Sequence, residues 1–248
     1  MVGVLSKLYT LNGKTMSLDI NKVAIKTSIA SCFGSTMKDE EASAEFLDEL
    51  ANKAEEITVG AAEYLFREKD SSDYVYIPVS GSIMLERSTS TGSRQVFAFL
   101  FTGNLLGISE TASYSFSAKT LTESTVIKIH QKIIRNVFDK HPTVAKRYQN
   151  VTNHILSLIL DQLFVMGQKT AHQRIAHFLL DMEHRLGHGS SKFHLPMSRQ
   201  DIADYLGMSL ETSSRGFSKL KKDMLIHIES NYQITILDRD ALFAYSES

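Results

Sequence analysis

Two short helical segments joined by a glycine constrain this chain more than any other feature, and they lie between Ser198 and Lys222. Ser198 is a candidate N-cap with Asp201 three residues later, which is the spacing of a capping box. Gly207 can end the first segment because glycine adopts a positive φ without steric cost, and Ser209 can cap the second. Helix, glycine turn and second helix form the helix-turn-helix pattern.

The second of these segments has an apolar face and a basic face. Phe217 and Leu220 point inward, and Glu211 is its only acid. Its basic residues are Arg215, Lys219, Lys221 and Lys222. The chain has a net charge of −1, so this is a local excess of positive charge, as expected for a helix that enters a DNA groove. The alternative is an ordinary helical hairpin with a solvated basic face.

Two short alternating segments follow, at 224–228 and 233–236, and residues 229–232 between them are typical of a turn. Alternation of apolar and polar residues on both sides of a turn predicts a β-hairpin. A helix-turn-helix followed by a hairpin is a winged helix. This favours nucleic-acid binding over the ordinary helical hairpin.

The sequences RIAHFLLDMEHRL and LPMSRQDIADYLGMSLETSSRGFSKLKKDMLI resemble the DNA-binding domain of the CRP/FNR superfamily of bacterial transcription regulators. The resemblance is closest to the FNR and FixK branches, whose recognition helix carries an E-x-x-S-R motif, matched here by Glu211, Ser214 and Arg215. It extends from about Glu63 to Leu242 and is strongest in the last third. It implies a sequence-specific regulator that binds a palindrome of TTGAT half-sites as a homodimer, with RNA polymerase as a further partner if it activates transcription.

This assignment gives the helix-turn-helix residues expected roles. Glu211, Ser214 and Arg215 are expected to read bases, because the planar fork of Arg215 matches the two acceptors of guanine and Glu211 can accept from the amino group of cytosine or adenine. The residues expected to contact the DNA backbone are Ser198, Ser209, Lys219, Lys221 and Lys222.

The region before position 135 has a different pattern. After a helical segment at 39–56, strand candidates at 74–79, 82–85, 96–101 and 125–129 are separated by glycines. Many short strands predict a sandwich or barrel. The resemblance, through SGSIML and GNLLGI, specifies a jelly-roll sensor domain (a double-stranded β-helix like that of cyclic-nucleotide-binding domains). The predicted class is α+β: an extension or short helix at 1–40, the sensor at 41–135, a dimerisation helix at 136–168 and a winged helix-turn-helix at 169–248.

A long helical run starts near Pro142 and carries apolar residues at alternating spacings of three and four. This predicted seam consists of Tyr148, Val151, Ile155, Leu158, Gln162 and Val165. A second stripe beside it consists of Leu156, Ile159, Leu163 and Met166. A helix that is apolar on two adjoining faces needs two partners, so we expect one face to contact the same helix of a second subunit. The alternative is a helix wholly buried in one subunit. The break at 167–170 predicts a hinge.

Cofactor chemistry is limited by residues that the chain lacks. Its single cysteine, Cys32, cannot supply the ligands of an iron–sulfur cluster, and we interpret it as an inert thiol near a flexible segment. In the cyclic-AMP branch a glycine–glutamate pair and an arginine–serine pair hold the phosphate. Here these pairs are Gly107-Ile108 and Ala112-Ser113, so cyclic-nucleotide binding is not expected. Haem stays an open alternative, because a single axial histidine leaves no motif.

Other classes of function find less support. His184 and His188 have metal-ligand spacing, but Gly187 lies between them and no third ligand is evident, so no metal site is expected. Without a phosphate-binding glycine loop or a nucleophile elbow, the chain is not expected to be an enzyme. It has no long apolar run and no secretory leader, which favours a cytoplasmic protein that does not contact membrane. A haem- or ligand-gated sensor and a sensor-only binding module remain the alternative functions.

Overall fold

A computed structural model describes residues 7–11, 14–18, 20–32, 40–230 and 232–248. The chain folds into two compact units. The first unit contains Met1–Ile83 and Phe99–Asn153, and the second contains Met84–Ala98 and His154–Ser248. The chain therefore passes from one unit to the other three times. In the described part of the chain, no helix has the length and apolar character needed to cross a bilayer.

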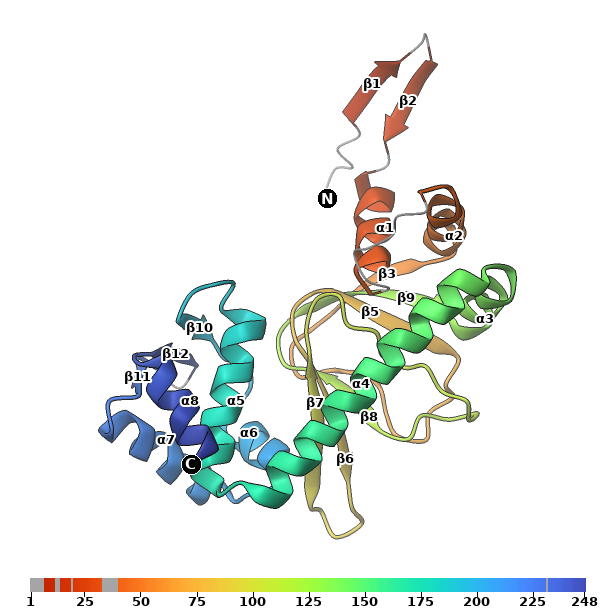
Figure 1. The fold of residues 1–248 in the computed structure, drawn as a ribbon. Coiled ribbons are helices and arrows are strands. Elements are labelled where there is room, and N and C mark those ends of the chain that lie inside the picture. Colours follow the sequence, from red (N-terminus) through yellow and green to blue (C-terminus); the bar gives the residue numbers. More distant parts are fainter. Residues whose placement is uncertain (1–6, 12–13, 19, 33–39, 231) are drawn as a thin grey trace. The chain divides into compact units, whose positions relative to one another are not determined.

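Two antiparallel sheets form the β-roll in the middle of the chain. One has the order β3-β9-β5, with β3 at Glu55–Val59, β9 at Ser124–His130 and β5 at Tyr74–Ser80. The other has the order β4-β8-β6-β7, with β4 at Tyr64–Phe66, β8 at Ser117–Thr120, β6 at Ile83–Ser88 and β7 at Arg94–Leu100. The predicted β-sheet sensor domain is confirmed, and Figure 1 shows the strands of its two sheets. Residues 84–98, which include most of the β6–β7 hairpin, belong to the second unit.

A glycine sets the turn that leads from β5 to β6. Gly81 has a φ of +84°, and a Cβ at this position would lie 2.2 Å from Oγ of Ser124. Only a residue without a side chain combines this backbone conformation with so close an approach. The sequence has a glycine between these two strands, as predicted, because the turn needs a positive φ and because Ser124 leaves no room for a side chain.

Two N-terminal helices belong to the core of the first unit. Helix α1 (Ile20–Cys32) and helix α2 (Glu40–Asn52) pack against each other, and α1 also contacts β5 (Figure 1). They are preceded by a hairpin of β1 (Lys7–Leu11) and β2 (Lys14–Leu18). Of the two expectations for residues 1–40, an extension or a short helix, the structure has a helix at α1.

Cys32 lies in this core, and the neighbouring segment that was expected to be flexible, 33–39, lies outside the described residues. Its side chain is 5% exposed and donates to the carbonyl oxygens of Ser28 and Asn104. Burial raises the pKa of the Cys32 thiol to about 12, with a smaller opposing contribution from Ser31. The thiol is therefore held in its unreactive, protonated form.

Two helices follow the roll. Helix α3 (Gln131–Lys140) ends at His141, and α4 (Pro142–Gln168) starts with a proline, whose missing N–H costs nothing at the first helical position. Residues 136–140 belong to α3 rather than to the long helix that was predicted to include them. Helix α4 continues through Gly167, so the predicted hinge is reduced to Lys169 and Thr170.

The winged helix lies in the second unit. Its helices are α5 (Ala171–Leu186), α6 (Arg199–Leu206), α7 (Leu210–Lys222) and α8 (Arg239–Glu247). Its antiparallel sheet has the order β10-β12-β11, with β10 at Lys192–His194, β12 at Gln233–Ile236 and β11 at Ile226–Ile228. The predicted hairpin corresponds to β11 and β12, whereas β10 was not predicted.

Candidate nucleic-acid interface

The ends of α6 and α7 are formed by the residues that the sequence indicated. The hydroxyl of Ser198 accepts from the backbone N–H of Asp201 at 3.1 Å, and the Asp201 carboxylate accepts in return from the N–H of Ser198 at 2.9 Å. Gly207 ends α6 with a φ of +62°, and Ser209 caps α7 by accepting from the N–H of Thr212. The predicted helix-turn-helix is therefore present.

One face of α7 is fixed against α5. Phe217 and Leu220 are buried, as expected from the sequence. Gly216 lies where the two helices approach most closely, because a Cβ there would come within 2.2 Å of Cδ1 of Ile175. This contact leaves the opposite face of α7 free to meet a ligand.

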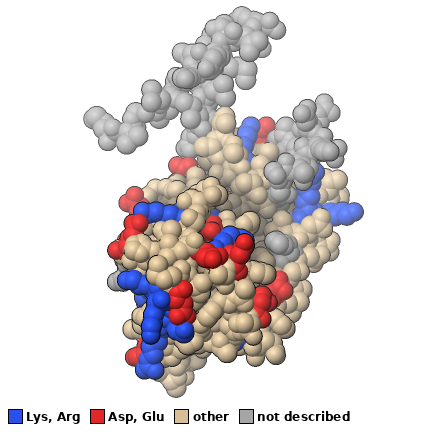
Figure 2. Space-filling model, turned by 60° about the vertical axis from the view of Figure 1, so that its left-hand side comes forward, with Lys and Arg blue, Asp and Glu red and all other residues tan. Residues whose placement is uncertain are grey.

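That opposite face carries the predicted base-reading residues. Glu211, Ser214 and Arg215 are exposed, and so are Lys221 and Lys222. Figure 2, which brings forward the side that holds α7 in Figure 1, shows Lys and Arg side chains gathered in a band along one edge, with Asp and Glu beside them. The burial of Phe217 and Leu220 and the exposure of the basic residues agree with the sequence pattern of one apolar and one basic face.

Two charged residues of α7 are held by neighbours. The carboxylate of Glu211 has a lowered pKa because it accepts hydrogen bonds from its own backbone and from Ser209, with a further contribution from Arg215. Lys219 donates to Asp223 at 2.6 Å, and this bond raises its pKa. Both pairs are exposed, and such pairs are held weakly. They do not prevent either side chain from turning to DNA.

Arg199 is a residue that sequence reasoning missed. Its guanidinium lies 3.4 Å from the ring centroid of Phe217, and burial lowers its pKa to about 10. Within the described residues, one of its terminal nitrogens is buried without a hydrogen-bond partner. A positively charged group with an unsatisfied donor is suited to an anion. The only sequence signal that could have pointed to Arg199 as a candidate site residue is its position directly after the N-cap Ser198.

The connection between α4 and α5 is held by a second arginine. Arg174 donates to the carbonyl oxygens of Met166, Lys169 and Leu206 at 2.5, 2.9 and 3.0 Å. It thus satisfies carbonyl groups at the ends of α4 and α6, which have no partner within their own helices. The short linker at 169–170 is therefore a fixed corner.

Helix α4 exposes the middle of its predicted seam but not its ends. Ile155 and Leu158 are 43% and 54% exposed, whereas Val165 is buried by its own chain. Tyr148 stacks on Phe138 at a centroid distance of 5.0 Å. Val151 is half-buried, and Gln162 has a buried side-chain nitrogen with no partner among the described residues.

The second stripe of α4 is at least as exposed as the first. Leu156, Ile159 and Leu163 are 54%, 52% and 60% exposed, and Met166 is half-buried. Leu160 and Phe164 are also more than half exposed. The alternative of a helix wholly buried in one subunit is therefore wrong for this chain taken alone. Apolar surface of this extent usually marks an interaction site.

Three aromatic rings pack together inside the β-roll. Phe66 stacks on Tyr114 at a centroid distance of 3.7 Å and lies 5.7 Å from Tyr76, and all three are buried. The hydroxyl of Tyr114 donates to the carbonyl oxygen of Tyr74 at 2.5 Å. Burial is the main cause of the raised pKa values of Tyr76 and Tyr114.

The two positions compared with the phosphate-binding pairs lie close to this aromatic cluster. Gly107 is so close to it that a Cβ would approach the Tyr74 carbonyl oxygen at 2.8 Å. The carbonyl oxygen of Ser113 accepts from Thr111, and that of Ala112 accepts from the N–H of Ser72. These groups are used for internal hydrogen bonds rather than directed at a ligand.

A helix end separates His184 from His188, the pair with metal-ligand spacing. Helix α5 ends at Leu186 with Gly187 as its C-cap, so His184 and His188 do not share one helix. Over the residues that the structure describes, no group of three or more His, Cys, Asp or Glu could hold a metal ion.

Comparison with known proteins agrees with this geometry. Residues 173–245 match the model of the Crp-like helix-turn-helix domain, and residues 56–141 match the cyclic nucleotide-binding domain. The transcriptional activatory protein AadR of Rhodopseudomonas palustris is 35% identical over 184 residues, which are 73% of this chain and 77% of that protein. The chain belongs to the CRP/FNR family of transcription regulators.

Proteins named FixK are also similar to this chain in sequence and in structure. The nitrogen fixation regulation protein FixK of Rhizobium meliloti is 34% identical over 72% of this chain and 81% of its own length. The structure of FixK2 from Bradyrhizobium japonicum has a TM-score of 0.74 at 31% identity, covering 77% of this chain and 96% of that one. This CRP/FNR protein is therefore a DNA-binding regulator with a sensor domain of the cyclic-nucleotide-binding fold.

Proposed function

We propose that two copies of this chain bind a palindromic DNA site, each inserting α7 into one major groove. The observation that carries the proposal is the pairing of two open surfaces: the basic face of α7 and the apolar surface of α4. A palindrome requires two recognition helices related by a two-fold axis about one helical turn apart, and a self-complementary helix contact supplies that axis.

The bases are read by Glu211, Ser214 and Arg215. Arg215 donates both arms of its guanidinium to a guanine, and Glu211 accepts from a cytosine or adenine amino group. By likeness to the FNR and FixK branches the half-site is TTGAT. The exposure of all three side chains on one helix face supports this assignment.

The DNA backbone is bound by the residues around these three. Lys219, Lys221 and Lys222 neutralise phosphates, and Ser198 and Ser209 place helix N-termini toward them. We add Arg199 to this set, because it directly follows the N-cap Ser198, and its unpartnered nitrogen would gain a phosphate oxygen if the side chain turned away from the Phe217 ring.

The dimer forms through α4. The seam at Ile155 and Leu158 is our first choice, and the stripe at Leu156, Ile159 and Leu163 is the alternative. The dimer acts without catalysis, in the bacterial cytoplasm where the chromosome lies. It contacts RNA polymerase if it activates transcription.

A haem- or ligand-gated sensor is the second candidate, and the aromatic interior of the roll argues against it. The histidines of the first unit, His130 and His141, also argue against haem binding, because both have partners within the chain. His130 accepts from the N–H of Lys132 at 3.1 Å and packs against Tyr74, and His141 packs against Phe46. A sensor-only module would have no use for the exposed E-x-x-S-R face.

Binding to a fluorescent duplex with two TTGAT half-sites tests the proposal. We expect a complex of two chains per duplex without added ligand, and at least about 10³-fold weaker binding to a duplex with scrambled half-sites. Equal binding to both duplexes, or one chain per duplex, would contradict it. Binding that requires haem or a cyclic nucleotide would support the second candidate.

A further inference from the structure

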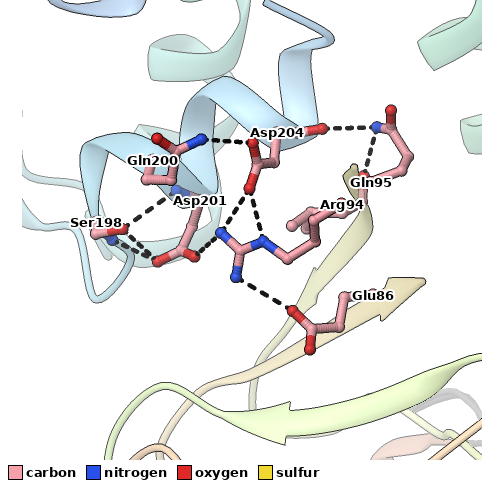
Figure 3. Close-up of polar contacts among 8 residues, drawn as sticks. Glu86, Arg94, Gln95, Ser198, Gln200, Asp201 and Asp204 are labelled. Atoms are coloured by element: carbon pink, nitrogen blue, oxygen red, sulfur yellow. Dashed lines mark hydrogen bonds and ion pairs between the residues drawn. The ribbon is translucent and has the colours of Figure 1, made fainter. Parts of the chain in front are cut away.

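One arginine of the β6–β7 hairpin serves three carboxylates within the second unit. Nε of Arg94 donates to Asp204 at 2.6 Å, and one terminal nitrogen lies 2.6 Å from Asp201 (Figure 3). The other terminal nitrogen donates to Glu86 at 3.2 Å. Asp201 and Asp204 belong to α6, the first helix of the helix-turn-helix, whereas Glu86 is on the same hairpin as Arg94. We call these four residues the Arg94 cluster.

The Arg94 cluster is shielded from water and its hydrogen bonds are well satisfied. The side chains of Asp201 and Asp204 are 13% exposed and that of Glu86 is 7% exposed. The second oxygen of Asp201 accepts from Ser198, and the second oxygen of Asp204 accepts from Gln200. Burial lowers the pKa of Arg94, but the hydrogen bonds to Asp204 and Asp201 outweigh it and raise the pKa.

The residue after Arg94 reinforces this attachment. The side-chain nitrogen of Gln95 donates to the backbone carbonyl of Asp204 at 2.7 Å (Figure 3). Carbonyl groups in the last turn of a helix have no partner within it, and α6 has only eight residues. An isolated helix of this length is unstable in water, so contacts from the hairpin help to hold it.

We propose that Arg94 is a positioning residue for DNA binding, through which the β6–β7 hairpin holds α6 and neutralises its acids. Asp201 joins the two contacts. One of its carboxylate oxygens accepts from the backbone N–H of Ser198 in the capping box of α6, and the other pairs with Arg94. Without Arg94, three poorly solvated carboxylates would lie together, which is strongly unfavourable. Helix α6 would shift or fray, and α7, joined to it through Gly207, would lose one of its two supports and keep only its contact with α5.

The test compares Arg94→Gln with Arg87→Gln, which removes the same charge from an exposed position of the same hairpin. The inference rests on the proposed reading of DNA by α7, so the TTGAT duplex is the probe. We expect Arg94→Gln to bind it on the order of tenfold more weakly, within the usual range for coupling between two sites. Arg87→Gln should change affinity less than about twofold, as expected for an exposed charge. We expect Arg94→Lys to lie between Arg94→Gln and the native chain, since it keeps the charge but loses the fork.

A second substitution separates positioning from general damage. Asp204→Asn in the Arg94→Gln background removes one unbalanced carboxylate and should restore part of the lost affinity. Unchanged or tighter DNA binding by Arg94→Gln overturns the proposal, and so does a loss that Asp204→Asn leaves as it was.

Hydrogen exchange of the α6 amides without DNA gives a readout that does not depend on the proposed function. These amides should exchange faster in Arg94→Gln than in Arg87→Gln. If the native chain does not bind the TTGAT duplex, the proposed function fails, and this exchange measurement alone then decides whether Arg94 holds α6. Equal exchange in the two variants would refute the attachment.

Discussion

The interior of the β-roll and the surfaces of α4 and α7 use their side chains in opposite ways. Inside the roll, Phe66, Tyr76 and Tyr114 pack on one another, and the Tyr114 hydroxyl has a backbone partner. On α4 and α7, apolar and basic side chains lie exposed. Groups that are satisfied within the chain need nothing more, whereas exposed apolar and charged surfaces favour partners.

The two halves of the regulator thus differ in how many of these side chains are satisfied within the chain itself. In the domain that matches the cyclic nucleotide-binding model, three buried aromatic rings pack on one another. The output half has kept the features needed to bind DNA.

The strongest test of the open surfaces is a charge in the α4 seam. Ile155→Glu should place two carboxylates opposite each other in an apolar contact, at a cost on the order of several kcal/mol. Analytical ultracentrifugation should show a monomer, and binding to the palindrome should be lost. Gln149→Glu, which adds the same charge at an exposed position earlier on α4, should remain a dimer. If Ile155→Glu stays dimeric and Leu163→Glu does not, the second stripe forms the interface.

The closed interior is tested by Phe66→Ala. Removal of a buried ring leaves a cavity, and we expect the free energy of unfolding to fall by about 3–5 kcal/mol. Chemical denaturation measures this change. Phe97→Ala, which truncates a ring that is 49% exposed, should have a much smaller effect. Comparable losses would mean that the roll is not tightly packed around Phe66.

Base reading is tested by Arg215→Ala. Loss of a bidentate contact should weaken binding to the TTGAT duplex by about 1–3 kcal/mol and relax the preference at the guanine. Anisotropy titrations with duplexes changed at that one base pair measure both effects. An equal loss on every sequence would assign Arg215 to the phosphates.

The smallest expected effect concerns one phosphate contact. Lys222→Gln should lower the slope of log affinity against log salt by about one unit without changing sequence preference. Titrations at several salt concentrations measure the slope. Lys146→Gln, which removes a charge from α4, should leave it as it is. A slope unchanged by Lys222→Gln would remove this lysine from the interface.

Features that depend on neighbouring residues in the sequence were predicted well. Ser198, Gly207 and Ser209 lie where α6 and α7 begin and end, because a cap depends on the residue itself and those three or four positions away. Strands β5 and β9 were predicted for the same reason. Strands β4 and β10 have three residues each and were missed. Strand β11 is equally short but was predicted, because a turn and a second alternating segment follow it.

Features that depend on distant residues were missed. No local pattern connects Arg94 with Asp204, which lies 110 residues further along the chain. The inclusion of α1 in the core of the first unit likewise depends on packing against β5. The candidate site was predicted to the extent that it lies on one helix, whereas Arg199 was missed because its environment is supplied by Phe217 of the next helix.

Because the chain crosses between its two units three times, the second unit cannot be expressed as one continuous fragment of the gene. A truncated clone that starts at the beginning of α5 would encode the whole winged helix but not residues 84–98, which belong to the same unit. Helix α6 would then be expressed without Arg94, which pairs with Asp201 and Asp204 in the full chain. Poor solubility or weak activity of such a fragment would reflect where the gene was cut rather than a weakness of the DNA-binding surface. A fragment designed with both carboxylates changed to amides would be the better starting point.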